Sequence, residues 1–464
     1  MRLSTSARGT ASKRLANSMK PIRAPYCFSG GIHPVYSKDL TRSAPIQTLP
    51  CPPQLVIALS QHLGAPAVAI VKAGDSVSGG QRLADPAGVI SAPIHAPTSG
   101  KILRIEPAPT PLGRPVPAII LEPDGHDTWD SPLTPMPDWS RLDRKSLAGQ
   151  VGAAGVVGMG GAGFPTQVKL SPPADKPIDT LIINGAECEP YLTGDHRLML
   201  ERAEALWQGA AIIRYILGAK TVHIAIEDNK PDAIQALESA RTLEDAAVCI
   251  LKTSYPQGSE KQQIYSVTGR VVRTGGLPMD VGCVVENVGT TLAVWDAVVN
   301  GRPLVSRTIT VSGDAVAAPA NFLALIGTPF AALVDACGGA RGRIAKIISG
   351  GPMMGFAQAS LDVAMSKTSS GLLLLSASRV PGFTSQPCIA CGRCLDACPM
   401  GLMPAELSQC IEADDIDAAE HLFVMDCFEC GSCAFVCPAH RPLVQHMRRA
   451  KAIILARRRA AIKK

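Results

Sequence analysis

The stretch that decides the fold is Cys388-Ile-Ala-Cys-Gly-Arg-Cys-Leu-Asp-Ala-Cys-Pro399, with its second copy, Cys427-Phe-Glu-Cys-Gly-Ser-Cys-Ala-Phe-Val-Cys-Pro438. Each copy has the spacing C-x2-C-x2-C-x3-C-P, which bacterial proteins use to hold [4Fe–4S] clusters. Two-residue gaps let a tight loop aim three thiolates at one cluster, and we expect the fourth cysteine to start a helix and point to the other cluster. One predicted cluster therefore takes Cys388, Cys391, Cys394 and Cys437, and the other takes Cys398, Cys427, Cys430 and Cys433.

Other uses of cysteine fit this pattern less well. Structural zinc favours paired C-x2-C motifs with histidine as an option, not runs of four cysteines that end in proline. Disulfides need an oxidising compartment, and we expect no secretory signal at the start of this chain. The pattern therefore predicts a protein that moves single electrons. The remaining cysteines are expected to be buried thiols: Cys27, Cys51, Cys188, Cys249, Cys283, Cys337 and Cys410.

Length and charge set the broad organisation. A chain of 464 residues should hold three or four domains. It has no run of about 18 apolar residues, so we expect no membrane-spanning helix. The net charge of +6 comes from the two ends, since residues 1–23 and 441–464 carry six and nine basic residues and no acidic ones.

The basic ends have several interpretations. They would suit an anionic lipid surface, an acidic partner or nucleic acid. A solvated tail is the simpler interpretation of residues 1–20, and their Arg- and Ser-rich, acid-free sequence also resembles a transit peptide. Residues 441–464 predict either a basic amphipathic helix or a frayed tail. Because a nucleic-acid role would rest on the tails alone, we predict none.

Residues 24–122 predict an all-β module, since short apolar runs alternate with turn signals. Lys72–Val77 and Ala96–Gly100 make this module resemble a biotinyl/lipoyl-like flattened barrel. Such barrels carry their prosthetic group on a lysine in an exposed hairpin, but the corresponding position here is Val89 and no lysine lies near it. We therefore interpret the module as a docking or structural piece. Residues 123–145, with several prolines, predict a linker.

A glycine-rich loop opens the next domain with Gly158-Met-Gly-Gly-Ala-Gly-Phe-Pro-Thr166. Glycines at this density allow positive φ, and consecutive amides in such a turn can hold a phosphate, although a tight turn alone would also explain them. Lys169 follows as a candidate cation. The predicted strand Thr180–Asn184 then leads into Glu187 and Glu189, at the end of a strand where open α/β sheets bind ligands. An acidic surface loop is the alternative interpretation of these two carboxylates.

Hydrophobic periodicity predicts the remaining elements. The predicted helices are Leu198–Leu217, Pro231–Ala240, Phe330–Ala336 and Pro404–Val424, and the predicted strands are Thr221–Ile226, Ala247–Lys252 and Thr308–Ser312, with Cys283–Thr290 closing the α/β domain.

Taken in order, these motifs resemble two related families. Gly160–Thr166, Asn184–Pro190 and Asn287–Thr290 resemble the flavin-binding subunit of respiratory NADH dehydrogenase, complex I. The resemblance is closer to the RnfC family of the Rnf electron-transport complex, named RsxC and Rsx in some bacteria, and it covers nearly all of residues 24–440. The motifs that carry it are Gly30–Pro34, Gln61–Gly64, Ala92–Gly100, Tyr255–Lys261, Gly350–Gly355 and the two cysteine runs.

The resemblance implies a site for FMN and NADH. It implies that the glycine loop cradles FMN through Gly158, Gly160, Gly161, Ala162 and Gly163, with Lys169, Asn184, Glu187, Asn287 and Thr290 around it. Phe164 would face the nicotinamide, and Glu189 and Glu260 would lie where NADH enters. The chain departs from the complex I pattern at Ala186, where an acidic residue is usual, and at Met159, where an arginine is usual. Nucleotide contacts are therefore expected to differ in detail.

The resemblance also implies a multidomain fold of α+β and α/β type. Its predicted parts are a basic flexible tail (1–23), a lipoyl-like β barrel (24–122), a linker (123–145), a Rossmann-like FMN- and NADH-binding domain (146–300), a β-grasp or SLBB-like module (301–360), a linker with strands (361–386), a ferredoxin-like domain with two [4Fe–4S] clusters (387–440) and a basic C-terminal helix or tail (441–464).

The implied function is that of a peripheral subunit on the cytoplasmic side of a bacterial inner membrane. Electrons would pass between NADH and ferredoxin-side carriers through FMN and two [4Fe–4S] clusters, in either direction. An iron–sulfur subunit and integral membrane subunits would be its partners and would couple the transfer to ion translocation. The alternatives are the NAD-side subunit of a soluble flavin/iron–sulfur dehydrogenase or hydrogenase, and a wiring module that carries clusters without flavin.

Overall fold

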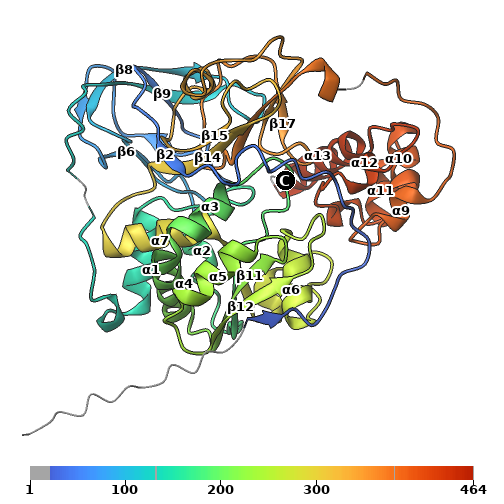
Figure 1. The fold of residues 1–464 in the computed structure, drawn as a ribbon, viewed down its shortest axis with the longest axis horizontal. Helices are drawn as coiled ribbons and strands as arrows, with labels where there is room; N and C mark the ends of the chain where they lie inside the picture. Colours follow the sequence, from blue (N-terminus) through green and yellow to red (C-terminus); the bar gives the residue numbers. More distant parts are fainter. Residues whose placement is uncertain (1–20, 131–132, 381, 463–464) are drawn as a thin grey trace, which may run out of the picture.

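The computed structural model describes residues 21–130, 133–380 and 382–462, and side chains as far as residue 461. Most of the predicted basic N-terminal tail, residues 1–20, lies outside these ranges, as do the last two residues. Four sheets and a separate group of helices make up the described chain (Figure 1).

A five-stranded parallel sheet, in the order β1-β12-β11-β10-β13, forms the parallel-sheet domain. Its strands are β1 (Ile22–Arg23), β10 (Thr180–Asn184), β11 (Thr221–Glu227), β12 (Ala246–Leu251) and β13 (Cys283–Asn287). Alternate strand residues face opposite sides, so Leu181 and Ile183 belong to one buried cluster and Ile182 to another. Helices cover both faces, as the apolar strand sequences require.

The helices of this domain are α1 (Arg144–Ala153), α2 (Thr166–Lys169), α3 (Gly194–Glu201), α4 (Ala203–Leu217), α5 (Pro231–Ser239), α6 (Glu260–Thr268) and α7 (Val288–Val299), with short 3₁₀ turns η1 (Trp139–Arg141) and η2 (Pro278–Val281). Core residues of α1, α4, α5 and α7 join the cluster on one face of the sheet, and those of α6 join the cluster on the other. The single helix predicted over 198–217 is wrong in its extent, because the structure has α3 and α4 with a break at Arg202. Helix α4 then ends at Gly218, whose φ of 69° suits a glycine cap.

A six-stranded mixed sheet, in the order β17-β16-β18-β14-β15-β2, packs with α8 to form the β-grasp module. Its elements are β2 (Ile46–Thr48), β14 (Ser306–Ser312), β15 (Ala320–Leu325), α8 (Phe330–Ala336), β16 (Lys346–Ser349), β17 (Phe356–Gln358), β18 (Gly371–Leu375) and η3 (Ala377–Arg379). The predicted strand at 308–312 and the predicted helix at 330–336 are confirmed.

Two small antiparallel sheets form the barrel module and share one buried cluster. Their strands are β3 (Leu55–Ala58), β4 (Val68–Ala69), β5 (Ser76–Val77), β6 (Arg82–Asp85), β7 (Ile94–His95), β8 (Gly100–Ala108) and β9 (Val116–Pro123). The predicted all-β character is confirmed, but the first part of residues 24–122 departs from the expectation. Instead of joining the barrel, β2 pairs with β15 of the β-grasp module. Strand β1 lies in the segment predicted as a flexible tail (1–23), and it pairs with β12, so the tail prediction is wrong for these two residues. Between β1 and β2 the chain passes beside the C-terminal helices (Figure 1).

The cysteine-rich module is helical. It contains α9 (Arg393–Asp396), α10 (Pro404–Glu412), α11 (Ile416–His421), η4 (Val424–Asp426), α12 (Ser432–Phe435) and α13 (Leu443–Ile462). The predicted helix over 404–424 is divided at residues 413–415, where Asp414 has a φ of 61°. The third cysteine of each run, Cys394 or Cys433, lies in a short helix and the fourth follows it, so the expectation that the fourth cysteine starts a helix is wrong.

Helix α13 belongs to the core of this module. Its Met447 and Ile454 pack against α10 and α11 in one buried cluster. On its polar side, ion pairs join Arg449 to Asp414, Arg457 to Asp417 and Arg458 to Glu420, at 2.6 to 2.7 Å. The basic C-terminal segment is therefore a packed helix whose acidic partners lie in the same module, and the alternative of a frayed tail is wrong for its described part.

Candidate functional site: the ends of the parallel strands and two cysteine sets

A switch in strand order marks the first candidate site. The chain runs outward from β10 through β11 to β12 and then returns to add β13 on the other side of β10. Open α/β sheets bind ligands outside the carboxyl ends of the strands at such a point, and we call the surroundings of these strand ends the crevice. The paired strands β10 and β13 end side by side at Asn184 and Asn287, whose Cα atoms are register partners. The structure thus brings together two residues 103 positions apart that were both predicted for the site.

The glycine loop is fixed to this same place. The Met159 N–H donates to Thr290 Oγ1 at 2.9 Å, and the Gly158 N–H donates to the carbonyl of Phe164 at 2.8 Å. A Cβ on Gly160 would lie 2.9 Å from Cβ of Asn287, so only glycine allows this approach. Thr290 therefore anchors the loop instead of presenting its hydroxyl to an open site.

The middle of the loop is open. Residues 160–162 are exposed, and a Cβ on Gly161 would meet no atom within 4 Å. Gly163 has a φ of 71° and packs closely against the backbone of Gln61. A loop that is anchored at both ends and exposes consecutive amides between them is suited to holding a phosphate group.

Asn287 has two structural partners at the end of β13. Its Oδ1 accepts from the N–H groups of Gly289 and Thr290, which caps α7, and its Nδ2 donates to Oδ2 of Asp195 at 2.6 Å. Burial, together with the nearby Glu187 carboxylate, raises the pKa of Asp195 to about 7. The crevice therefore contains a carboxyl group that titrates near neutral pH.

Asn184 is held in the same way. Its Oδ1 accepts from Gln263 Nε2 at 2.6 Å and from the N–H of Ala186, and its Nδ2 donates to the carbonyl of Gly258 at 2.8 Å. These bonds tie the end of β10 to the turn before α6 and to α6 itself.

Glu187 caps α3 through the N–H groups of Asp195 and His196, at 2.9 and 3.2 Å. Lys38, which no prediction included, donates to the carbonyls of Glu187, Glu189 and Leu192. Burial lowers the pKa of Lys38. One half-buried lysine from the N-terminal segment therefore shapes the loop that follows β10.

Lys169 and Glu260 form an ion pair beside the end of β13. Lys169 Nζ lies 2.8 Å from Glu260 Oε1 and 2.8 Å from the carbonyl of Val285. Burial raises the pKa of Glu286 to about 7, although the Lys169 ammonium acts in the other direction. The predicted cation of the site thus already has two carboxyl groups beside it.

Glu189 contacts another module. Its carboxylate accepts from the N–H groups of Met353 at 3.1 Å and Met354 at 2.8 Å, in a loop of the β-grasp module. A Cβ on Gly351 would lie 2.2 Å from Glu189 Oε2, which explains the glycine there. Burial raises the pKa of Glu189 to about 7. In this structure Glu189 joins two modules, and Glu260 is paired with Lys169.

The buried polar atoms around the crevice are suited to a polar ligand such as FMN. Thr166 Oγ1, Gln263 Oε1 and Glu286 Oε1 are buried and have no hydrogen-bond partner within the described ranges. Thr166 follows the glycine loop, Gln263 contacts Asn184, and Glu286 precedes Asn287. Because an unsatisfied buried polar group costs about 1–3 kcal/mol, such a group of them indicates missing partners.

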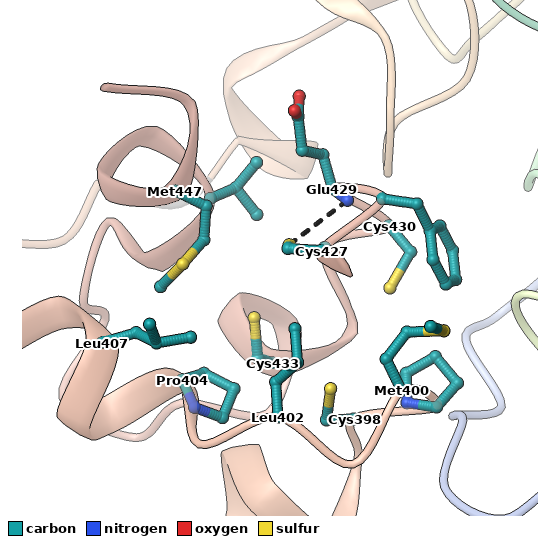
Figure 2. A pocket seen from close by; sticks show the side chains of 14 residues that line it. Cys398, Met400, Leu402, Pro404, Leu407, Cys427, Glu429, Cys430, Cys433 and Met447 are labelled. Atoms are coloured by element: carbon teal, nitrogen blue, oxygen red, sulfur yellow. Dashed lines mark hydrogen bonds between the residues drawn. The ribbon is translucent and has the colours of Figure 1, made fainter. Parts of the chain in front are cut away.

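Four of the predicted ligands surround a small pocket in the cysteine-rich module, and we call Cys398, Cys427, Cys430 and Cys433 the inner set. Their side chains point toward one another from both runs (Figure 2). The pocket wall is otherwise mainly apolar, with Met400, Leu402, Leu407 and Met447 among its residues. The Glu429 N–H donates to Cys427 Sγ at 3.4 Å, the kind of contact that stabilises a thiolate.

The other four predicted ligands, Cys388, Cys391, Cys394 and Cys437, line a larger and more open pocket and form the outer set. Cys388 and Cys391 are exposed, whereas Cys430 of the inner set is buried. The Arg441 N–H approaches Cys437 Sγ at 3.5 Å. Each set contains three cysteines of one run and the fourth of the other, as the spacing predicts.

Neither set has the geometry of a single-metal site. In the part of the chain that the structure describes, no three metal-ligating side chains converge as they would on one ion. A four-iron cluster does not require such convergence, because each thiolate binds a different iron. Four thiols around an apolar pocket therefore fit an iron–sulfur cluster better than a zinc ion.

Of the other seven cysteines, Cys27 and Cys51 are exposed, so the expectation that all are buried is wrong for these two. Cys188, Cys249, Cys283 and Cys337 are buried, and Cys410 is half-buried.

Sequence reasoning missed three further residues at the crevice. Lys38 and Asp195 are described above, and the third is Arg307, whose guanidinium is buried and donates to the carbonyls of Met159 and Lys367 at 3.4 and 2.6 Å. Asp195 and Arg307 lie outside the glycine and strand-end motifs, and no spacing in the sequence connects them to the site. The proximity of Lys38 to the Gly30–Pro34 motif was the only available signal.

Family models match four parts of the chain. They are an RnfC barrel sandwich hybrid domain over residues 26–126, a Nuo51 FMN-binding domain over 151–296, an SLBB domain over 308–357 and a 4Fe-4S dicluster domain over 387–441. The predicted multidomain fold class is thereby confirmed.

Relatives match along nearly the whole chain. The C-subunit of the proton-translocating ferredoxin:NAD(+) oxidoreductase complex of Clostridium ljungdahlii is 47% identical, over 91% of this chain and 92% of the relative. The C-subunit of the Na(+)-translocating ferredoxin:NAD(+) oxidoreductase complex of Acetobacterium woodii is 43% identical, over 93% and 98%. The C-subunit of an ion-translocating oxidoreductase complex of Rhodobacter capsulatus is 43% identical, over 94% and 85%.

Among solved structures, an NAD+-reducing [NiFe]-hydrogenase in the air-oxidized state matches with a TM-score of 0.48 and 22% identity, over 68% of this chain and 65% of that chain.

Proposed function

Because this chain belongs to the RnfC family of ion-translocating oxidoreductase complexes, we propose that it is the subunit that exchanges electrons with NAD(H). It acts as part of a ferredoxin:NAD+ oxidoreductase, with FMN and two [4Fe–4S] clusters as cofactors. When bound, FMN exchanges a hydride with the nicotinamide and single electrons with the clusters. The relatives and family models confirm the predicted function as an electron-transfer subunit of such a complex.

We assign the chain's own residues to three tasks. The loop Gly158–Gly163 offers amides to the FMN phosphate, and Asn184 and Asn287 fix the strand ends on which the flavin would rest. Lys169 holds Glu260 beside the crevice, and Phe164 lies next to the loop as a candidate nicotinamide contact. The eight cysteines of the inner and outer sets hold the clusters.

The observation that carries this proposal is the placement of the inner set next to the crevice. Cys430 and Ala397 share a buried apolar cluster with Cys188 and Tyr255, which belong to the loops at the ends of β10 and β12. The outer set opens toward solvent instead. We infer that the inner set connects to the flavin side and that the outer set meets the redox partner.

The partners are other subunits of the complex, and we propose that an iron–sulfur subunit approaches the outer set while integral membrane subunits provide the path for the ion. No helix within the described residues is long and apolar enough to cross a bilayer. We propose a peripheral position on the cytoplasmic side of the inner membrane. If so, the chain should sediment with isolated membranes and be released from them by salt or alkaline washing. A chain that is found entirely in the soluble fraction before any washing would contradict this location.

The central experiment is anaerobic. The full chain is reconstituted with iron, sulfide and FMN and mixed with NADH, while flavin absorbance and cluster EPR are followed together. We expect flavin bleaching and reduced-cluster signals. If the clusters are reduced by dithionite but not by NADH, and FMN is not retained, the chain is a wiring module and the proposal fails.

Two cysteine variants test the order of the sets. Cys437→Ser removes a ligand of the outer set and should leave an inner cluster that NADH still reduces. Cys430→Ser removes a ligand of the inner set and should leave an outer cluster that dithionite reduces but NADH does not. The opposite pattern would reverse our assignment of the two sets.

A further inference from the structure

One buried tyrosine joins the crevice to the inner cysteine set. Tyr255 has no exposed surface, and its hydroxyl donates to the carbonyl of Cys430 at 2.7 Å. Cys430 belongs to the second cysteine run, so this bond crosses from the parallel-sheet domain to the cysteine-rich module.

The backbone of Tyr255 reaches the first cysteine run as well. Its N–H and carbonyl both pair with Ile32, at 2.9 and 2.8 Å. The neighbouring Gly31 N–H donates to the carbonyl of Ala397 at 3.1 Å, and a Cβ on Gly30 would lie 2.8 Å from the carbonyl of Cys398. The inner set combines Cys398 with three cysteines of the second run. Tyr255 contacts the second run, and residues 30–32, which pair with Tyr255, contact the first run at Cys398.

Tyr255 also packs beside the loop at the end of β10. It shares the buried cluster with Cys188, whose Sγ accepts from the Gly258 N–H at 3.3 Å. The Gly258 carbonyl in turn accepts from Asn184 at the end of β10. A continuous path of packed and hydrogen-bonded groups therefore runs from the strand end to Cys430.

We propose that Tyr255 is a positioning residue that holds the Cys430 loop against the flavin domain and raises the reduction potential of the inner cluster through its hydroxyl dipole. This inference rests on the proposed function, because it requires a cluster in the inner set. The hydroxyl directs its proton toward Cys430 in a region that water does not reach. A positive dipole end near a cluster stabilises the reduced form, and it acts more strongly in a low dielectric.

Tyr255→Phe keeps the ring and removes only the donor. Tyr215→Phe is the matched control, because the Tyr215 hydroxyl also donates to a backbone carbonyl, that of Leu142, at 2.9 Å, but lies in α4. Both variants are made in the full chain loaded with FMN and clusters, and the two cluster potentials are measured by EPR-monitored redox titration.

In Tyr255→Phe we expect the inner-cluster equilibrium to shift about tenfold toward the oxidised form, the scale of one hydrogen bond, which is about 59 mV for one electron. The outer-cluster potential, the FMN content and the iron content should not change. Amide hydrogen exchange over residues 427–433 should become faster in Tyr255→Phe and stay unchanged in Tyr215→Phe.

The other outcomes are also decisive. Selective loss of the inner cluster from Tyr255→Phe supports the positioning role. Unchanged potentials with unchanged exchange, equal loss of both clusters, or the same effects in Tyr215→Phe overturn it. A parent chain that loads its clusters but is not reduced by NADH would contradict the proposed function instead, and its cluster potentials would still test Tyr255.

Discussion

Replacing Glu189 with glutamine separates two roles for this residue, a contact for NADH and a joint between modules. The carboxylate accepts two backbone N–H groups from the loop at Met353 and Met354, and burial raises its pKa from the ordinary 4.5 to about 7. If Glu189 is a joint, Glu189→Gln should change stability in a pH-dependent way and leave the Michaelis constant for NADH within about twofold. If Glu189 contacts the nucleotide, the main effect of the substitution should be a change in the Michaelis constant for NADH and not a change in stability.

The size of the effect follows from the pKa. A rise of about 2.5 units corresponds to about 3 kcal/mol between the two protonation states. Because the pKa in the folded state is the higher one, the folded protein binds more protons than the unfolded chain between pH 4.5 and 7. Protonated Glu189 therefore makes its full contribution to the stability of the folded protein below pH 4.5, and this contribution is lost as the pH rises through 7. Glutamine does not titrate, so its contribution is constant.

The assay is urea unfolding of the parent and of Glu189→Gln at several values from pH 5 to pH 8. Only the difference between the two proteins is interpreted, because Asp195 and Glu286 titrate in both. Between pH 5 and pH 8 the free energy of unfolding of the parent should fall by about 2–3 kcal/mol relative to that of the variant. Asp362→Asn, an exposed carboxylate in the β-grasp module, should stay within about 0.5 kcal/mol of the parent throughout. A constant difference between parent and Glu189→Gln would refute the reasoning.

Two further predictions concern the glycine loop and the barrel. Thr290→Val leaves the buried Met159 N–H without its acceptor. The free energy of unfolding should therefore fall by about 1–3 kcal/mol, and the protein should retain less FMN. An unchanged FMN content would show that the loop does not depend on this bond. Lys367→Met removes a buried amino group whose pKa burial lowers to about 7 from 10.5. Between these values the unfolded chain binds more protons than the folded protein. The free energy of unfolding of the parent should therefore rise by on the order of 4 kcal/mol relative to the variant as the pH increases from 7 to 10. If thermal or urea unfolding shows no such rise, the amine is not buried in its neutral form.

The sequence predicted the features that local chemistry dictates. Strand Thr180–Asn184 and helix Phe330–Ala336 have the predicted bounds, because each is an apolar run between clear breakers. The division of the cysteines into two sets also follows from spacing alone, since a three-residue gap cannot direct the fourth thiol at the same cluster as the first three.

What the sequence did not indicate depends on tertiary contacts. Lys38 holds three carbonyls of the loop after β10 from about 150 residues away, and only its proximity to the Gly30–Pro34 motif distinguishes it in the sequence from a surface lysine. Helix α13 looked suited to a membrane or an acidic partner, because its arginines are conspicuous while the acidic residues that pair with them lie on α11 and in the turn before it. Glu189 was assigned by its place after a strand, yet the direction of its side chain is set by a loop that begins about 160 residues later.

The barrel module shows why a fold can persist without the lysine that related barrels use. A swinging arm requires a barrel that leaves its hairpin free, but here the barrel is fixed to the crevice. The Leu63 N–H donates to the carbonyl of Gly163 at 3.1 Å, and the buried Lys367 donates to the carbonyls of Pro93 in the barrel and Gly155 before the glycine loop. Single electrons can pass between the flavin and the clusters through packed protein, so a swinging arm would not be needed to carry them. The same barrel can instead support the glycine loop at a fixed place, which agrees with a valine at position 89.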